Sequence, residues 1–328
     1  MEYRQLGPSD LNVSVICFGP MRCASREPGE DERSKKGEQA LRHALDLGIN
    51  FLHSSYEYGT RWMMARVLKD HPKRTEIHHV IKVPVPDAMD QDRFDESKFR
   101  MRIEQALREL HADRISVIQW MWRSSPNEDA RRLPLLAQII DDVTAAFERL
   151  RDEGKVSLLM TFPYTVACGR AAIATGRFSG LIAPYNLLET EFADLFDELT
   201  QRQMGFIPFR PLYQGLLTDQ RAVQSSLARS DRCAEPAYTA AYERLRAIQA
   251  TFAEDIGPSM TSFAIRFTLA HPAVASLVVG MNSIDQVNGV IKALDQKIPS
   301  QDIVERVRKI ASTESALPEP PHARKPKR

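Results

Sequence analysis

The stretch Ile49-Asn50-Phe51-Leu52-His53-Ser54-Ser55-Tyr56-Glu57-Tyr58-Gly59 decides the fold. An apolar run at residues 49–52 follows a helix-like segment and gives way to a polar, aromatic turn that ends at Gly59. In a parallel α/β protein the chemistry is carried at the carboxyl ends of the strands. The polar residues of this turn are therefore candidates for a functional site.

The same alternation of apolar strand and periodic helix continues along the chain. We predict strands at residues 13–18, 49–53, 77–83, 114–121, 156–162, 181–184, 205–209 and 275–279. We predict helices at residues 35–47, 61–69, 95–110, 134–152, 165–175, 192–203, 237–253, 259–270, 283–294 and 301–311. Such alternation indicates an α/β fold, a closed (β/α)8 TIM barrel with an N-terminal β-hairpin turning at residues 7–10 and an extra C-terminal helix. An open doubly wound sheet is the alternative, but no Gly-x-Gly-x-x-Gly follows the first strand.

Composition indicates one globular domain that binds neither nucleic acid nor a membrane. The 328 residues divide into a barrel over 1–312 and a Pro-rich basic tail over 313–328, which we expect to be disordered or, in the alternative, to bind anions. The formal net charge of +1 gives no field that would attract nucleic acid or an anionic membrane. The sequence leaves the oligomeric state open.

The cysteines and the N-terminus predict a cytoplasmic protein. The four cysteines are scattered and lack the spacing of a metal site, so we expect free thiols and no metal. No apolar run approaches the ~18 residues of a membrane span. The first residues lack the apolar core of a secretory signal.

Several segments, in order along the chain, resemble the aldo-keto reductase family. They include Met-Glu-Tyr-Arg-Gln-Leu-Gly at residues 1–7, Arg-His-Ala-Leu-Asp-Leu-Gly-Ile-Asn at 42–50, Tyr-Asn-Leu-Leu at 185–188, Gly-Leu-Leu-Thr at 215–218 and Phe-Ala-Ile-Arg-Phe at 263–267. The resemblance runs from residue 1 to about residue 295 and implies a barrel enzyme that transfers hydride between NADP(H) and a carbonyl compound.

The resemblance implies a catalytic set of Asp, Tyr, Lys and His, of which two members are present. Tyr58 matches the proton-donating tyrosine and Lys82 the lysine, whereas His53 replaces the aspartate and Met121 the histidine. A methionine sulfur is only a weak acceptor and cannot relay a proton. A buried lysine without an anion tends toward the neutral amine. Glu57 is a candidate substitute anion, with a solvent-facing side chain as the alternative.

The resemblance implies a cofactor site that is only partly retained. The positions that hold the nicotinamide amide in the family read Phe162-Pro163 and Ile182, which carry no polar side-chain group. A lost partner for a buried amide costs about 1–3 kcal/mol. The cofactor-binding positions that persist are Phe209, Leu212, Gly215, Gly280, Ser283 and Gln286. NADP(H) is therefore the expected cofactor by resemblance, with no cofactor as the alternative.

Bulky side chains near these positions predict a substrate pocket. The candidate lining residues are Met121, Trp120, Trp122, Arg123, Phe162 and Ile182. The aromatic residues either form an aromatic pocket or fill volume left by a missing cofactor. Arg123 either pairs with an anionic substrate or lies solvated in its loop. His53 is either a hydrogen-bonded core residue or an acid–base group suited to neutral pH.

Three functions remain open on the sequence. The first is a divergent enzyme that uses Tyr58, Lys82 and His53 for proton transfer on a small carbonyl or hydroxyl compound, as a dehydratase, isomerase or lyase. In that case Lys82 could alternatively form a Schiff base. The second is an ordinary NADP(H)-dependent carbonyl oxidoreductase, and the third is a non-catalytic ligand-binding or regulatory barrel.

Overall fold

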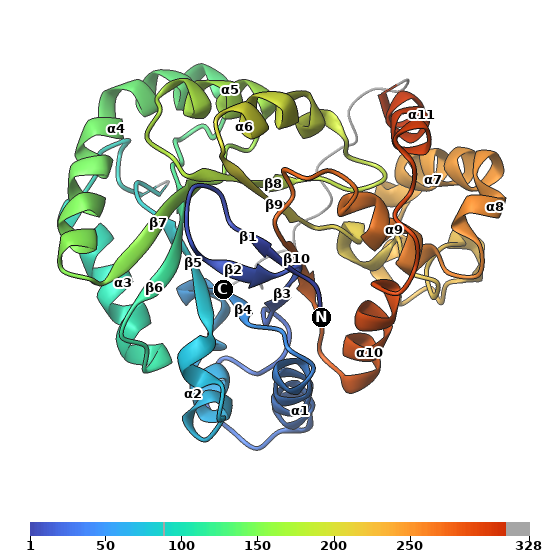
Figure 1. Ribbon diagram of the computed structural model, residues 1–328, viewed down its shortest axis with the longest axis horizontal. Coiled ribbons are helices and arrows are strands. Elements are labelled where there is room, and N and C mark those ends of the chain that lie inside the picture. Colours follow the sequence, from blue (N-terminus) through green and yellow to red (C-terminus); the bar gives the residue numbers. More distant parts are fainter. Residues whose placement is uncertain (88, 313–328) are drawn as a thin grey trace.

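A computed structural model describes residues 1–87 and 89–312, so the predicted tail at 313–328 lies outside the described residues. The chain opens with an antiparallel hairpin of β1 (Tyr3–Gln5) and β2 (Asn12–Ser14), as predicted from the turn at residues 7–10. Eight parallel strands then close into a barrel in the order β10-β3-β4-β5-β6-β7-β8-β9 (Figure 1). The predicted (β/α)8 barrel is confirmed.

The barrel strands lie close to the predicted positions. They are β3 (Ile16–Gly19), β4 (Phe51–Ser55), β5 (His78–Pro84), β6 (Ile115–Met121), β7 (Val156–Thr161), β8 (Gly180–Pro184), β9 (Gly205–Phe209) and β10 (Leu277–Gly280). β3 is shorter than the predicted strand at 13–18 because residues 12–14 pair with β1 instead. In Figure 1 the strands form the centre of the molecule, and helices surround them.

The helices fill the intervals between strands. The α-helices are α1 (Glu32–Asp46), α2 (Arg61–Lys69), α3 (Glu96–Leu110), α4 (Asp129–Asp152), α5 (Val166–Ala174), α6 (Phe196–Gln201), α7 (Thr239–Thr251), α8 (Ala253–Ile256), α9 (Met260–Thr268), α10 (Ile284–Ala293) and α11 (Gln301–Ser312). The short 3₁₀ turns are η1 (Tyr56–Tyr58), η2 (Arg74–Glu76), η3 (Glu191–Leu195), η4 (Tyr213–Gly215), η5 (Gln224–Ser226), η6 (Arg232–Ala234) and η7 (Pro236–Tyr238).

The largest departures from the predicted helices are at α4 and in the segment at residues 192–203. α4 begins at Asp129, five residues before Pro134, where the predicted helix began. Proline lacks an N–H and is favoured in the first turn, yet here the helix continues through it at the cost of one backbone hydrogen bond. The predicted helix at 192–203 is divided into η3 and α6.

Side chains of the strands alternate between two cores. On β6, Val117 belongs to the core inside the barrel, whereas Ile118 and Trp120 belong to the larger core between strands and helices. Leu6, at the hairpin, packs with the interior core, so the hairpin covers one end of the barrel. The interior is therefore a packed core, so a ligand that reaches into the barrel can only enter at the other, carboxyl end of the strands.

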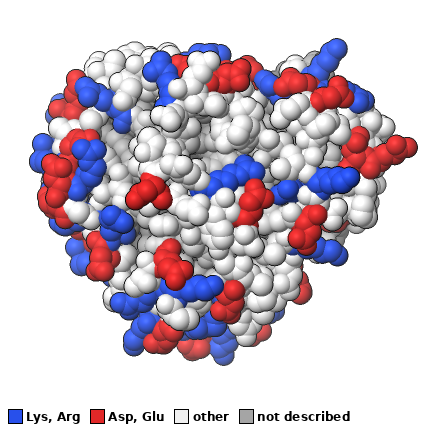
Figure 2. All heavy atoms as spheres, in the orientation of Figure 1, with Lys and Arg blue, Asp and Glu red and all other residues white. Residues whose placement is uncertain are grey.

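The charges on the surface are mixed in sign. On the face shown in Figure 2, basic and acidic side chains are interspersed around the rim, and neither sign forms one large patch. This distribution agrees with the formal net charge of +1. Among the described residues, no helix combines the length and the apolarity needed to cross a bilayer.

A pair of glycine substitutions tests the packing of α1. A Cβ at Gly37 would lie 2.0 Å from the carbonyl oxygen of Cys23, whereas a Cβ at Gly289 in α10 meets no heavy atom within 4 Å. We expect Gly37→Ala to lower the free energy of unfolding by about 1–3 kcal/mol because the helix must move away from the loop. We expect Gly289→Ala to raise it by about 1 kcal/mol through helix propensity. Urea unfolding measures both, and equal effects would contradict the close approach at Gly37.

Candidate active site

A short turn at the end of β4 positions the candidate catalytic residues. The Ser55 hydroxyl accepts a hydrogen bond from the backbone N–H of Glu57 at 3.2 Å. The turn η1 then ends at Gly59, whose φ of +66° favours glycine. Because β4 pairs in parallel with β5, Ser55 lies opposite Lys82. This register brings Glu57, Tyr58 and Lys82 together at the carboxyl end of the barrel.

Glu57 supplies the carboxylate for Lys82. The Lys82 Nζ donates to Glu57 Oε2 at 2.7 Å, and the two side chains are 16% and 25% exposed. Burial opposes ionisation of Glu57, but the charges of Lys82 and Arg123 outweigh it, so the pKa of Glu57 is lowered. Glu57 is therefore the substitute anion for Lys82, and its side chain does not simply face solvent.

Tyr58 lies near both the ammonium group of Lys82 and the imidazole of His53. Its ring centroid is 5.9 Å from Lys82 Nζ and 5.9 Å from the ring centroid of His53. Burial raises the pKa of Tyr58 well above its usual value, and Glu57 raises it further, while Arg123 opposes the shift. In the described part of the chain the phenol oxygen has no hydrogen-bond partner. Tyr58 is therefore a protonated phenol at neutral pH whose O–H can serve a ligand.

His53 is a buried, neutral imidazole. It is 2% exposed, and its Nε2 lies 2.7 Å from Gln119 Oε1, so Nε2 carries the proton in this pair. Burial lowers the pKa of His53 to about 4, and Lys82 and Arg61 add to the shift by repelling a positive charge. This geometry favours the hydrogen-bonded core residue over an acid–base group poised at neutral pH.

The structure separates the candidate pocket residues into two groups. Met121 is 4% exposed and lies on the same side of β6 as Gln119, while Ile182 is fully buried in the interior core. Phe162 packs edge-on against Phe209, with ring centroids 5.8 Å apart. The positions that would face a nicotinamide amide are thus occupied by hydrocarbon.

Trp120 and Trp122 do not line the barrel mouth, and their assignment to the pocket is wrong. Both are fully buried in the core between strands and helices. Their indole N–H groups donate to the carbonyl oxygens of Val85 at 2.6 Å and Arg132 at 2.9 Å. Trp120 lies one residue from Gln119, and neighbouring residues of a strand face opposite sides.

Arg123 joins the network around Glu57. Its Nε donates to the hydroxyl of Tyr164 at 3.0 Å, and its Nη1 lies 3.4 Å from Glu57 Oε1. Burial works against its charge, but Tyr164 and Glu57 stabilise it, so the pKa of Arg123 is raised. The arginine is thus not simply solvated in its loop, and it adds a fixed positive charge beside the Lys82–Glu57 pair.

The candidate cofactor positions gather on one side of the mouth. Phe209 ends β9 and lies opposite Val278 of β10, so the loops after these two strands are neighbours. Gly215 has a φ of +97°, and Leu212 packs against the main core in the same loop. Ser283 caps α10 by accepting from the N–H of Gln286, whose own side chain accepts from the N–H of Asn282 at 2.8 Å, and Gly280 is exposed.

Sequence reasoning missed a group of arginines near these loops. Arg22 follows β3, and partial burial of its guanidinium lowers its pKa, as does repulsion from Arg232, Arg33 and Arg221. Among residues 1–87 and 89–312, the one carboxylate that pairs with this group is Asp231, which lies 2.8 Å from Arg221. These residues are up to 210 positions apart in the chain, so no local pattern could have revealed them. Gln119 was also missed, although a polar residue within an apolar strand was a usable signal.

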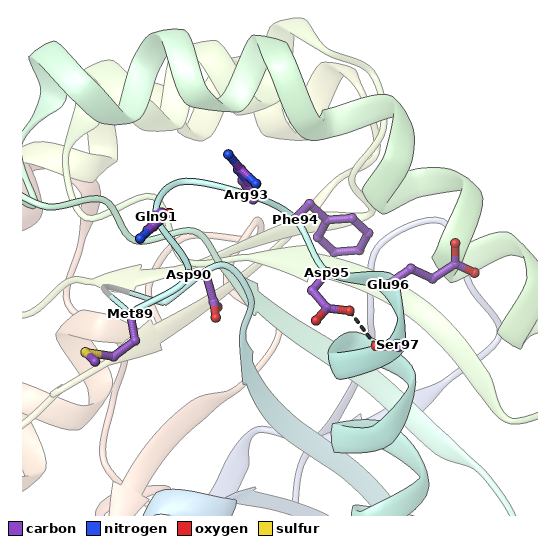
Figure 3. Close-up of a pocket in the computed structure, with 8 residues that line it drawn as sticks. All are labelled: Met89, Asp90, Gln91, Arg93, Phe94, Asp95, Glu96 and Ser97. Carbon is purple, nitrogen blue, oxygen red and sulfur yellow. Dashed lines mark hydrogen bonds between the residues drawn. The ribbon is translucent and has the colours of Figure 1, made fainter.

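A separate cavity lies in the loop that follows β5 (Figure 3). It has a volume of about 560 Å³ and is lined by residues 89–91 and 93–97. Its carboxylates have local structural roles: Asp90 accepts from Lys98 at 2.6 Å, and Asp95 accepts from the hydroxyl of Ser97 at 2.6 Å and caps α3. This cavity is therefore explained by the loop's own folding and lies apart from Tyr58.

The described residues contain no group of three or more His, Cys, Asp or Glu side chains that could hold a metal ion. The four cysteines are free and buried. The candidate site consists of Tyr58, Lys82, Glu57 and Arg123. Neutral His53 precedes them on β4.

Comparison with known proteins identifies the family. Residues 15–311 match the sequence profile of the aldo/keto reductase family. The chain is a member of that family. It is 25% identical over 317 residues to the uncharacterized oxidoreductase YrpG of Bacillus subtilis, covering 90% of this chain and 91% of the relative. It is 26% identical over 317 residues to the L-galactose dehydrogenase of Arabidopsis thaliana, covering 90% and 89%.

Solved structures show the same fold. The holo form of an aldo-keto reductase from Bacillus halodurans superposes with a TM-score of 0.73 at 22% identity, covering 97% of this chain and 98% of that one. A glycerol dehydrogenase from Gluconobacter oxydans superposes with a TM-score of 0.73 at 20% identity, covering 98% of each chain. Within this aldo/keto reductase family member, the substitutions at His53 and Met121 are departures from the catalytic set that the resemblance implied.

The depressed pKa of His53 predicts a pH-dependent stability. An unfolded histidine binds a proton near pH ~6.5, whereas folded His53 has a pKa of about 4. Between these two pKa values the unfolded chain binds more protons than the folded chain, so the free energy of unfolding rises with pH. When the pH falls from about 7 to about 5, His53 should therefore lower the free energy of unfolding by about 2 kcal/mol. Over this pH range we expect the free energy of unfolding of His53→Asn to fall by about 2 kcal/mol less than that of the parent protein.

Urea unfolding at the two pH values measures this difference. His79, whose pKa burial also lowers to about 4, is present in both proteins and cancels from the comparison. An identical pH dependence of the two proteins would show that His53 is not buried in its neutral form.

Proposed function

We propose that this aldo/keto reductase family member is an NADP(H)-dependent oxidoreductase that interconverts a small carbonyl compound and its alcohol. The observation that carries the proposal is the ion pair of Lys82 and Glu57, with 2.7 Å between Nζ and Oε2, beside Tyr58. A neighbouring carboxylate favours the charged form of a lysine. The pair therefore provides the cation that a catalytic phenol needs, despite the loss of the aspartate at position 53.

Each residue of the site has a role in this proposal. When bound, the cofactor supplies or accepts the hydride at the carbonyl carbon. In reduction, Tyr58 donates its phenolic proton to the carbonyl oxygen, which yields the alcohol. The charges of Lys82 and Arg123 stabilise the phenolate that remains, and Glu57 holds both cations in place. In oxidation, the phenolate of Tyr58 accepts the proton from the alcohol hydroxyl.

The residues of the mouth fit the phosphates of a dinucleotide better than its carboxamide. The arginines at positions 22, 221 and 232 form a region of excess positive charge next to the loop that contains Gly215. Phosphate groups are favoured partners for guanidinium groups. In contrast, Phe162 and Ile182 offer the carboxamide no polar side chain. We therefore expect the phosphates to dominate cofactor affinity.

Removal of one arginine tests whether contacts to the phosphates dominate the affinity for the cofactor. Arg22 is exposed and forms no ion pair among the described residues, so Arg22→Met should preserve the fold. We expect it to weaken binding of NADPH and of 2′,5′-ADP, which lacks the nicotinamide, by a similar factor of about tenfold, because one charged hydrogen bond is lost. Calorimetric titration measures both ligands. Arg246→Met, at another exposed position, is the control, and unchanged affinity in Arg22→Met would contradict phosphate binding here.

Removal of the phenol tests the catalytic role. We expect Tyr58→Phe to lower kcat for NADPH-dependent reduction of aldehydes by about 100-fold or more, because the proton donor is lost. Glu57→Gln should also lower kcat, because it removes the carboxylate that holds Lys82. NADPH absorbance follows the reaction over a panel of aldehydes and ketones. Tyr3→Phe, a phenol-to-phenyl change at the hairpin, should leave kcat unchanged.

A second candidate is proton-transfer chemistry without hydride transfer, as in a dehydratase, isomerase or lyase. The contact of Phe162 with Phe209 favours it, because it places hydrocarbon where the amide would lie. Tyr58-dependent turnover without added nucleotide, together with no NADPH binding at millimolar concentration, would select this candidate over the first. A protein without either activity would instead be a ligand-binding barrel.

A further inference from the structure

A second cavity lies beside the turn that contains the candidate catalytic residues. It has a volume of about 520 Å³, and one wall is formed by Ser55, Tyr56 and Gly59. The other walls come from α2, from the end of α3 and from the loop that contains Arg26. Tyr58, Lys82 and Glu57 are not among its lining residues. The cavity therefore shares a backbone segment with the candidate active site but is distinct from it.

The cavity carries an excess of positive charge. Arg61 is paired with Glu109 at 2.9 Å, so these two charges cancel. Lys69, Arg108 and Arg26 also line the cavity, and within the described ranges 1–87 and 89–312 none of the three forms a salt bridge. Lys69 and Arg108 are exposed. Three basic side chains thus line one cavity without forming a salt bridge of their own among the described residues.

Arg26 is held at the cavity by the catalytic turn itself. Its Nη2 donates to the carbonyl oxygen of Glu57 at 2.7 Å. A Cβ at Gly59 would lie 3.0 Å from the Cα of Arg26, so only glycine permits this approach of the two backbones. The position of Arg26 is therefore fixed before any ligand binds, which lowers the entropic cost of binding.

An aromatic side chain provides the apolar surface of the cavity. The indole N–H of Trp62 donates to the carbonyl oxygen of Ser25 at 3.0 Å, which fixes the ring. The guanidinium of Arg66 lies 4.8 Å from the Trp62 ring centroid, and Arg66 is itself paired with both Glu30 and Glu38. A ligand body can therefore pack near Trp62 while its charged group meets unpaired cations of the cavity lining.

We propose that this cavity binds a small phosphomonoester with an aromatic or apolar body. Five basic side chains line the cavity and three carboxylates pair with two of them, which leaves a net charge of +2. This charge suits a dianionic phosphate, because lysine and arginine both form charge-assisted hydrogen bonds to phosphate oxygens. A monoanionic group would leave one charge unmet. The fixed aromatic ring favours a ligand with a planar or apolar group over inorganic phosphate alone. This inference does not depend on the hydride-transfer proposal.

Titration with phenyl phosphate tests the inference. Of the three tryptophans, Trp120 and Trp122 are fully buried and Trp62 is partly exposed at the cavity, so tryptophan fluorescence reports binding there. We expect a saturable change with phenyl phosphate, a weaker response to inorganic phosphate and none with phenol. The double variant Lys69→Gln, Arg108→Gln should bind phenyl phosphate about tenfold more weakly or worse, because two charged hydrogen bonds are lost.

A matched control separates this site from general charge effects. Arg170→Gln combined with Lys297→Gln removes the same net charge at exposed positions away from the cavity and should leave the affinity unchanged. Calorimetry on all three proteins confirms the fluorescence result. The inference is overturned if phenyl phosphate shows no saturable binding at millimolar concentration. It is equally overturned if the Lys69, Arg108 variant binds as tightly as the parent protein, because the ligand would then occupy another site such as the barrel mouth.

Discussion

The ion pair of Lys82 and Glu57 is the interaction on which the candidate site depends. It joins the end of β5 to the turn after β4 and holds a carboxylate beside a phenol at the barrel mouth. Removing one partner of such a half-buried pair leaves the other charge without compensation, which is costly. The pair is possible because Ser55 lies opposite Lys82 in the sheet and the Ser55 hydroxyl bonds the backbone N–H of Glu57.

The same pair explains the environment of its neighbours. Burial and the charges of Lys82 and Arg61 keep His53 neutral, so it cannot take the place of a carboxylate. Arg123 reaches Glu57 from the loop after β6 and adds a second positive charge. Tyr58 remains protonated because burial and Glu57 both disfavour its anion. The family resemblance implies a carboxylate on the strand, at position 53, whereas in this protein Glu57 of the following turn supplies the carboxylate.

The barrel mouth is divided between two sets of loops. The loops after β4, β5 and β6 carry the phenol, the carboxylate and the nearby cations, whereas those after β3, β9 and β10 carry glycines and an arginine group. The proposed oxidoreductase function uses both sets, the phenol for the proton and the arginine group for the phosphates. The hydrocarbon at Phe162 and Ile182 separates this member from the pattern that the family resemblance implied, which shows how a barrel is retained while its site changes.

Local patterns in the chain were enough to predict the barrel, because apolar strands and periodic helices depend on neighbouring residues. They also placed Lys82 near the end of a strand and Tyr58 in the turn after one, whereas the catalytic roles of both residues were implied by the family resemblance. Three features required the tertiary structure. The side of β6 that Trp120 faces depends on strand register, the direction of Glu57 depends on Lys82 across the sheet, and the group around Arg22 forms only when distant loops meet. Each depends on contacts between segments far apart in sequence, about which composition and periodicity carry no information.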